Sequence, residues 1–271
     1  MGELDSMLHG DRDLIARLVQ DNARLLLAWQ ALDVIDAMSL DAMKRGRHDV
    51  TTKPDGTPVT GLELEVERLL VSRIDAAFPS DSVLGEESGV HRKGADLWII
   101  DPIDGTGNYL EGVPIYAHMI SYTSNRKVAF SIVSAPGLNA RWWALGGAGA
   151  FRGDRRIQVS TVADMGAAQL CYGGLRDYDE EAAHRLVRLA RRCRRSRGYG
   201  NFLPHMLVAE GTYDIAASAP GNAIWDLLPL VHIVTEAGGR MTSFSGGAPN
   251  AGTPVLTSNG ALHNDAGSVL A

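Results

Sequence analysis

Two aspartates, Asp101 and Asp104, are the residues whose type and spacing point most directly to chemistry. They follow the apolar run 98–100, which predicts a buried strand that ends on Asp101, and Pro102 predicts a rigid turn between the two acids. Such an arrangement points two carboxylates and the carbonyl of Ile103 at one spot. Because hard oxygen ligands of this kind suit Mg²⁺, the segment predicts a magnesium site.

A helix predicted to begin after Thr106 would place an anion site beside these oxygen ligands. The first N–H groups of a helix have no partner inside it, and its N-terminus favours a negative charge such as a phosphate. Metal ligands next to a phosphate cradle are what phosphoryl transfer requires. The segment 98–106 therefore indicates chemistry on a phosphate group.

Further acids stand elsewhere in the chain. Glu86 and Glu87 follow another short apolar run, and Asp226 stands at the expected N-terminus of a helix whose first turn holds Pro229. Each acid has an ordinary alternative: an N-cap for Asp226, a solvated turn for the glutamate pair, and a turn after a strand for Asp101. None of them alone is evidence of a metal, and it is their joint order that favours the metal interpretation.

Three separated motifs resemble those of the inositol monophosphatase family. They are GEES at 85–88, WIIDPIDGT at 98–106 and WD…TEAGG at 225–239, and residues 53–63 are similar to that family's KPDxTPVTxxD segment. The bacterial histidinol-phosphate phosphatase branch is resembled by VSAP at 133–136, RWWA at 141–144 and LVAEG at 207–211. The likeness covers nearly the whole chain. It implies an α/β fold, the layered αβαβα sandwich of the inositol monophosphatase and fructose-1,6-bisphosphatase type.

The resemblance also implies roles for individual residues. The implied magnesium ligands are Glu86, Asp101, the carbonyl of Ile103, Asp104 and Asp226. The implied catalytic residues are Glu63, Thr106, Glu86 and Asp104, with the Thr106 hydroxyl orienting a water, Glu63 behind it and Glu87 supporting the metal ligands. The implied phosphate and substrate contacts are Gly105, Thr106, Asn201, Ala219 and Asp226. Four carboxylates this close would repel one another without cations, so two or three Mg²⁺ ions are expected.

Four positions depart from the family's pattern. Glu63 stands where an aspartate is usual, Gly107 replaces a lysine, and Asn201 and Ala219 stand where relatives carry acids. The extra methylene of Glu63 moves its carboxylate by roughly one bond length, which puts the third metal ion in question. Histidinol phosphate carries an amine and an imidazole, so the loss of two nearby acids favours a more neutral ester.

These residues lead to one functional prediction with two alternatives. The chain is expected to be a Mg²⁺-dependent phosphoric monoester hydrolase, similar to histidinol-phosphate phosphatase, that acts on a small metabolite phosphate monoester. The first alternative is a phosphatase of a specialised-metabolite pathway that acts on a sugar, cyclitol or nucleoside monophosphate. The second is a non-catalytic scaffold protein on the same fold. Family members are commonly homodimers, so the resemblance implies a homodimer.

The elements that must position these residues are predicted from periodicity and turn residues. One or two helices are expected over 11–43, then an irregular segment over 53–60 and a helix over 62–78. Strands are expected at 97–100, 117–122, 128–133, 141–145, 169–173, 213–217 and 255–258, and helices at 180–195, 202–210 and 226–237. The predicted lobes are an N-terminal α+β lobe, 1–158, with most metal ligands, and a C-terminal α/β lobe, 159–271, with Asp226 and the substrate-reading residues. The two lobes are expected to share one cleft.

The composition argues against several other classes of protein. A net charge of −6 over 271 residues argues against nucleic-acid or membrane binding, and the basic run 191–197 is interpreted as the solvated end of a helix, with a local basic patch as the alternative. Two cysteines without CxxC spacing and a charged N-terminal segment favour a cytoplasmic protein. No apolar run approaches the roughly 20 residues of a membrane span. His118 and His232 are expected to be packed side chains, and His205 is a candidate for the substrate pocket.

Overall fold

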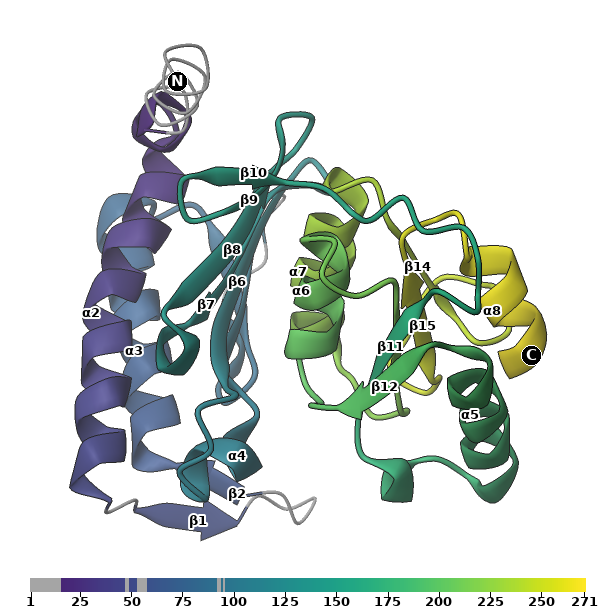
Figure 1. Ribbon diagram of the computed structural model, residues 1–271. Helices are drawn as coiled ribbons and strands as arrows, with labels where there is room; N and C mark the ends of the chain where they lie inside the picture. The colour runs from purple at the N-terminus through teal and green to yellow at the C-terminus, as the bar shows by residue number, and fades with distance from the viewer. Residues whose placement is uncertain (1–15, 47–48, 53–57, 92–93, 95) are drawn as a thin grey trace, which may run out of the picture. The chain divides into compact units, whose positions relative to one another are not determined.

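The structure, a computed structural model, describes residues 16–46, 49–52, 58–91, 94 and 96–271, which fall into two compact units (Figure 1). Unit 1 comprises Met1–Trp143 with Phe151–Arg156, and unit 2 comprises Ala144–Ala150 with Ile157–Ala271. The start of the first predicted helix, the N-terminal segment and most of the predicted irregular segment lie outside the described residues. Within the described ranges, no helix is long and apolar enough to cross a membrane.

Unit 1 is built on a sheet with strand order β10-β9-β8-β7-β6-β5-β3-β4 and with helices α2 and α3 packed along it (Figure 1). Strand β3 runs parallel to β5, whereas the pairs β3–β4, β5–β6 and β6–β7 are antiparallel. The strands of this sheet are β3 (Ser82–Gly85), β4 (Gly89–His91), β5 (Leu97–Asp104), β6 (Ala117–Ser124), β7 (Lys127–Ala135), β8 (Ala140–Leu145), β9 (Gly149–Arg152) and β10 (Arg155–Ile157). The remaining elements are α2 (Ala23–Arg45), α3 (Gly61–Ala77), α4 (Thr106–Leu110), a 3₁₀ helix (Pro136–Leu138) and the hairpin of β1 (Val50–Thr52) and β2 (Pro58–Thr60).

Trp98 anchors the buried part of β5. Its ring is fully buried, lies 6.3 Å from the ring of Phe78 and 5.1 Å from that of Tyr122 between centroids, and its indole N–H donates to Asp81 at 2.9 Å. Asp81 also accepts two hydrogen bonds from the guanidinium of Arg24, at 2.7 and 2.9 Å. A bidentate pair of this kind is among the stronger polar contacts in proteins. The contact ties helix α2 to the strand that carries the first two candidate metal ligands.

Unit 2 is a five-stranded sheet, in the order β12-β11-β13-β15-β14, with helices on both faces (Figure 1). Side chains alternate along its strands: Leu170 packs with residues of α5 and α8, whereas Cys171 packs with Val208 of α6. The strands are β11 (Gln169–Tyr172), β12 (Arg195–Gly198), β13 (Ile215–Ser218), β14 (Arg240–Ser243) and β15 (Val255–Ser258). The helices are the 3₁₀ turn Leu175–Asp177, α5 (Glu180–Arg192), α6 (Leu203–Ala209), α7 (Ile224–Glu236) and α8 (His263–Leu270).

The predicted α/β class is confirmed. Unit 1 contributes a helix layer and a sheet, and unit 2 contributes a sheet between two helix layers. The basic run 191–197, however, is the end of a helix only in its first two residues, Arg191 and Arg192. Helix α5 ends at Arg192, and residues 195–198 form the edge strand β12, paired in parallel with β11. Pairing with a neighbour in the sheet outweighs the helical pattern here, and exposed arginines are suited to an edge strand because charge deters further pairing.

Two smaller predictions also need correction, and the structure decides a third. The part of the predicted irregular segment that the structure describes, residues 58–60, forms strand β2. Of the one or two helices predicted over 11–43, the described residues show two helical stretches, separated at residues 21–22, where the side chain of Asn22 accepts the N–H of Leu25 at 3.0 Å and so begins α2. Helix α7 begins at Ile224, two residues before the predicted start, so Pro229 lies inside the helix rather than in its first turn.

Candidate active site

Strand β5 does not end at Asp101 as predicted. It continues through Pro102 to Asp104, and its register on β6 shifts between the two acids: Asp101 pairs with Met119, and Asp104 pairs with Ala117. Between these two pairs the chain advances three residues along β5 but only two along β6. One extra residue in one strand defines a β-bulge. A proline fits such an irregularity because it has no N–H to donate to the ladder.

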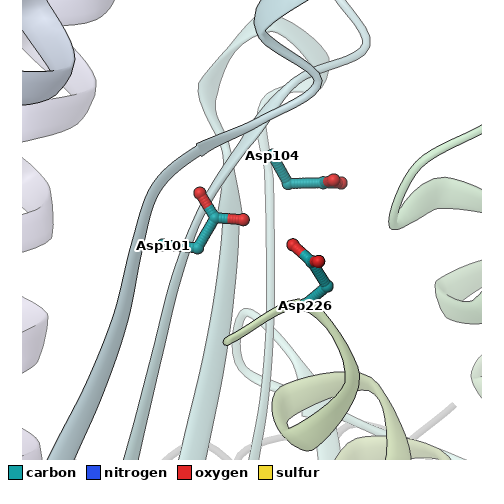
Figure 2. Close-up of side chains that lie close together, drawn as sticks. All are labelled: Asp101, Asp104 and Asp226. Atoms are coloured by element: carbon teal, nitrogen blue, oxygen red, sulfur yellow. The ribbon is translucent and has the colours of Figure 1, made fainter. Parts of the chain in front are cut away.

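The bulge decides the direction of the two carboxylates. In a regular strand, residues three apart point to opposite faces, because side chains alternate. The extra residue brings Asp101 and Asp104 back into phase, and a carboxylate oxygen of one lies within 4.8 Å of a carboxylate oxygen of the other. Figure 2 draws both side chains on β5, together with that of Asp226. Two like charges this close, one of them buried, favour a cation between them.

Glu63 is fully buried in the first turn of α3 and joins two segments of unit 1. One carboxylate oxygen accepts the backbone N–H of Thr60, and the other accepts the hydroxyl of Thr106 at 2.6 Å. The Thr60 hydroxyl in turn accepts the N–H of Glu63 at 3.2 Å, which completes a capping box. Burial raises the pKa of Glu63 above its usual range, the negative charge of Glu86 adds to the rise, and the hydrogen bonds oppose it.

The glutamate at position 63 fits its place in the first turn of α3. A capping box typically has Glu or Gln at the third helical position, where the side chain reaches back to the N–H before the helix, although Asp226 makes the same contact at the start of α7. Glu63 holds this position in α3, and its second oxygen still reaches Thr106. The spacing Thr60-x-x-Glu63 is a sequence signal for this arrangement, and the predicted helix start at residue 62 does not take it into account.

Thr106 is the first residue of α4 and follows Gly105, whose φ of +90° is a left-handed conformation that favours glycine. Its hydroxyl lies 2.6 Å from the Glu63 carboxylate and 3.2 Å from the carbonyl of Ile103. A hydroxyl has one proton, and the shorter bond to the carboxylate takes it, so the oxygen lone pairs are oriented to accept from a donor such as water. A Cβ at Gly107 would meet no atom within 4 Å, so packing does not require glycine there.

Glu86 and Glu87 lie in the turn between β3 and β4. The N–H of Glu86 donates to the carbonyl of Ile100 at 3.1 Å, which extends the β3–β5 pairing by one residue. The glutamate pair is therefore a half-buried turn held against β5, not a freely solvated one. Glu67, which is not among the residues predicted from the sequence, accepts the backbone N–H of Glu87 at 2.9 Å. Its signal is an acid on the buried face of α3, four residues after Glu63.

Asp226, Asn201 and Ala219 belong to unit 2. Asp226 is the third residue of α7, and its carboxylate accepts the N–H of Ala223, which is the N-cap; the alternative of Asp226 as the N-cap itself is therefore wrong. Asn201 is exposed between β12 and α6 with a φ of +55°, a conformation in which asparagine is enriched. Ala219 follows β13 and packs against the core beneath α5 and α8.

The buried histidines are packed, as predicted for two of them. His118 donates from Nδ1 to the carbonyl of Pro102 at 2.5 Å, and its Nε2 lies 3.0 Å from the hydroxyl of Ser39, so it holds the bulge of β5 from behind. Burial lowers its pKa. His232 is also buried. His205, the candidate for the substrate pocket, is instead a packed side chain of unit 2, and burial lowers its pKa to about 4.

The donor atoms of unit 1 fit a hard divalent cation. The carboxylates of Asp101 and Asp104 and the carbonyl of Ile103 are oxygen donors, which suit Mg²⁺ better than a softer transition metal. Among the described residues, Glu86 is not one of the acids that cluster with these two aspartates. Glu63 and Thr106 are joined by a hydrogen bond directly beside the Ile103 carbonyl. The structure thus brings five of the predicted metal and catalytic groups, Glu63, Asp101, Ile103, Asp104 and Thr106, to the end of β5, with Glu86 on the neighbouring turn.

Comparison with known proteins identifies the family. The sequence model of the inositol monophosphatase family matches residues 21–270. The chain is 39% identical to the histidinol-phosphatase of Streptomyces coelicolor over 252 residues, which cover 89% of this chain and 94% of that protein. It is 40% identical to the histidinol-phosphatase of Mycobacterium tuberculosis over 251 residues, which cover 89% and 95%. The solved structure of an IMPase from Thermotoga maritima is 32% identical and superposes with a TM-score of 0.83 over 92% of this chain and 97% of that one. The chain therefore belongs to the inositol monophosphatase family and is a phosphoric monoester hydrolase of that family.

Proposed function

We propose that this protein hydrolyses a small metabolite phosphate monoester in a Mg²⁺-dependent reaction, with histidinol phosphate as the first candidate substrate. The observation that carries the proposal is the bulge of β5, which sets Asp101 and Asp104 on one face beside the Glu63–Thr106 pair. The likeness to two histidinol-phosphatases along most of their length supports the choice of substrate.

The proposed metal ligands are Glu86, Asp101, the Ile103 carbonyl, Asp104 and, from unit 2, Asp226, and we propose that they hold two or three Mg²⁺ ions. When bound, Mg²⁺ supplies Lewis-acid chemistry, since it polarises the phosphate, lowers the pKa of a water and neutralises the leaving oxygen. The half-buried Glu87, next to Glu86 in the same turn, supports these ligands.

Thr106 and Glu63 orient the attacking water in this proposal. The Thr106 hydroxyl donates its proton to Glu63 and therefore accepts a hydrogen bond from the water, which directs the water's lone pair toward phosphorus. Glu63 fixes the hydroxyl in that orientation through the 2.6 Å hydrogen bond. The backbone N–H groups of Gly105 and Thr106, at the start of α4, bind the phosphate oxygens.

Unit 2 supplies the residues that select the rest of the substrate in this proposal. Its two predicted contacts besides Asp226 are an exposed amide at Asn201 and a methyl group at Ala219, so neither provides a negative charge for the amine or imidazole of histidinol phosphate. This observation favours a second candidate, a neutral ester such as a sugar, cyclitol or nucleoside monophosphate.

The test is phosphate release by the full chain, with Mg²⁺ and with a chelator, from histidinol phosphate, inositol monophosphate, hexose phosphates, fructose 1,6-bisphosphate and nucleoside monophosphates. We expect release only with Mg²⁺ and fastest from histidinol phosphate. Preference for a neutral ester would support the second candidate, and Asn201→Asp and Ala219→Glu should then move selectivity toward the cationic ester. No release from any compound would contradict the proposal and favour a non-catalytic scaffold.

We also propose that the protein is a cytoplasmic homodimer, by its likeness to the family. Light scattering coupled to gel filtration should give twice the mass of one chain. Fractionation of the source cells should place the protein with cytoplasmic markers. A monomer at micromolar concentration, or a protein recovered with the envelope fraction, would contradict the corresponding part.

A further inference from the structure

We infer that Glu67 is a positioning residue of the metal site: its buried carboxylate holds the turn over residues 85–88 and thereby fixes Glu86 for Mg²⁺. The inference rests on the proposed function, because it assigns Glu86 as a ligand. Glu67 does not itself face the proposed substrate, since its carboxylate is occupied by the backbone of the turn.

The contacts of Glu67 are those of a built carboxylate site. The side chain is 2% exposed and lies on the face of α3 that packs on the sheet. One oxygen accepts the N–H of Glu87 at 2.9 Å, and the other accepts the N–H of Ser88 at 2.8 Å and also the Ser88 hydroxyl. Hydrogen bonds to an ionised acceptor are about twice as strong as neutral ones. The single side chain of Glu67 therefore holds the turn over residues 85–88.

Gly85 gives a second, independent sign of this contact. A Cβ built on Gly85 would lie 2.3 Å from the carboxyl carbon of Glu67 and 2.4 Å from each of its oxygens. Gly85 is not among the glycines with a positive φ, so its backbone conformation does not require glycine. The requirement comes from the close approach of the Glu67 carboxylate, which lies against both ends of the turn, at Gly85 and at Ser88.

Glu86 lies between these two fixed points. Its own N–H is bonded to the carbonyl of Ile100, and the next N–H, that of Glu87, is bonded to Glu67. The backbone of the proposed ligand is therefore fixed on both sides, by β5 and by α3. Residues that orient metal ligands in this way typically change metal affinity by 10- to 100-fold when they are removed.

A carboxylate is needed at position 67 because three donors converge on its two oxygens. The amide of a glutamine has one acceptor oxygen, and its NH₂ group would face a backbone N–H that also donates. Glu67→Gln therefore removes the hold on one side of the turn with almost no change in volume. Glu65, two residues earlier on the same helix, is exposed, so Glu65→Gln makes the same change of charge without touching the turn.

The experiment measures the Mg²⁺ concentration for half-maximal effect in the full chain by two methods, the Mg²⁺-dependent rise in melting temperature and the rate of phosphate release. We expect Glu67→Gln to raise this concentration by roughly 10-fold or more in both methods, with kcat at saturating Mg²⁺ within about 3-fold of wild type. Gly85→Ala, which carries no change of charge, should shift it in the same direction. Glu65→Gln should match wild type.

Each outcome decides the question. An unchanged half-maximal concentration in Glu67→Gln, a loss of kcat alone, or an equal shift in Glu65→Gln would overturn the positioning role. If the half-maximal Mg²⁺ concentration rises in Glu67→Gln but not in Gly85→Ala, the rise is an effect of the lost charge. That result would also overturn the positioning role. If Glu67→Gln does not fold, Ser88→Ala is measured in its place. A rise in its half-maximal Mg²⁺ concentration, smaller than the roughly 10-fold one expected for Glu67→Gln, would support the role, and no rise would contradict it. A wild type that neither responds to Mg²⁺ nor releases phosphate would instead refute the proposed function.

Discussion

Two regions of the molecule bury polar side chains in opposite ways. Around β5 in unit 1, the carboxylates of Glu63, Glu67 and Asp101 are at most 2% exposed. Around β15 in unit 2, two buried imidazoles are paired with hydroxyls. His205 lies 2.8 Å from Thr257 and 2.6 Å from Ser218, and His263 contacts Ser258 at 2.9 Å and Thr242 at 3.0 Å.

The difference shows how each region meets the cost of burial. Burial disfavours the charged form of any group, and a histidine meets that cost by remaining neutral: burial lowers the pKa of both His205 and His263 to about 4. In unit 1 the same cost raises the pKa of Glu63, and two aspartates lie side by side. The unit 1 region therefore gains from an added cation, whereas the unit 2 region is complete with its own hydrogen bonds. The first should respond to Mg²⁺ and the second to acid.

The largest effect is expected from Asp104→Asn, which removes one of the two in-phase carboxylates on β5. Because an amide is a weaker ligand than a carboxylate, the rate of phosphate release at saturating Mg²⁺ should fall by at least about 10³-fold, about 4 kcal/mol. The Mg²⁺-dependent rise in melting temperature should be lost as well. Without Mg²⁺ the variant should melt at or slightly above the wild-type temperature, since one of two repelling charges is gone.

Asp41→Asn is the matched control for this variant. Asp41 is an exposed acid of unit 1 that pairs with Arg45 one turn along α2. Its substitution by asparagine removes one negative charge, as Asp104→Asn does. It should keep the wild-type rate and response to Mg²⁺. Full activity in Asp104→Asn, or equal loss in both variants, would break the comparison between the two regions.

A smaller effect is expected from Thr106→Val, which removes the hydroxyl between Glu63 and the proposed water. General acid–base and positioning groups of this kind typically contribute 10²–10⁴-fold, so kcat should fall by roughly 10²-fold. The half-maximal Mg²⁺ concentration should change little, because the Ile103 carbonyl and the acids remain. The measurement is steady-state kinetics over a range of Mg²⁺ concentrations.

Thr106→Ser sharpens this result, because it keeps the hydroxyl and loses only a methyl group. It should retain activity within a few-fold of wild type. If Thr106→Ser is as slow as Thr106→Val, the hydrogen bond to Glu63 is not the reason for the loss, and packing at the start of α4 is.

The sequence alone predicts which acids form the proposed site but not how Asp101 and Asp104 come into phase. Asp101 and Asp104 stand out because they follow a buried apolar run, and the resemblance to the family adds Glu86 and Asp226. The bulge that turns both aspartates to one face depends on the pairing of β5 with β6, and pairing partners are not written in local sequence. The prediction that the strand ends at Asp101 places the two aspartates close together, but it attributes this to a turn and not to the bulge.

Contacts between distant segments are equally hidden. Glu63 meets Thr106 across 43 residues, and Glu67 meets Ser88 across 21, so neither bond follows from spacing; the first is expected only from the family resemblance, and the second is not expected. The capping box at Thr60 and the acid on the buried face of α3 are readable in retrospect, because both depend on helical spacing. Strand β12 cannot be read from the sequence in this way. Its arginines resemble those of a solvated helix, and only the pairing with β11 shows that they form a strand.

The smallest effect tests the unit 2 region. His205 is neutral when folded, with a pKa of about 4, and a histidine in the unfolded chain has a pKa near 6.5. Well above pH 6.5 neither state binds the proton. As the pH falls from 6.5 toward 4 the unfolded state takes up a proton that the folded state does not, so the free energy of unfolding decreases through this window. At pH 5 the loss from this one group should be about 2 kcal/mol relative to pH 7.

His205→Gln should remove this part of the pH dependence, because an amide does not titrate, and His184→Gln, at an exposed position on α5, should keep the wild-type curve. Urea unfolding at pH 7, 6 and 5 gives the dependence of the free energy of unfolding on pH for wild type and for each of the two variants. Mg²⁺ is left out so that metal binding in unit 1 adds no ligand effect. A curve for His205→Gln parallel to wild type would mean that the imidazole is protonated in the folded state. The two regions would then both bury charge, and the contrast between them would rest on His263 alone.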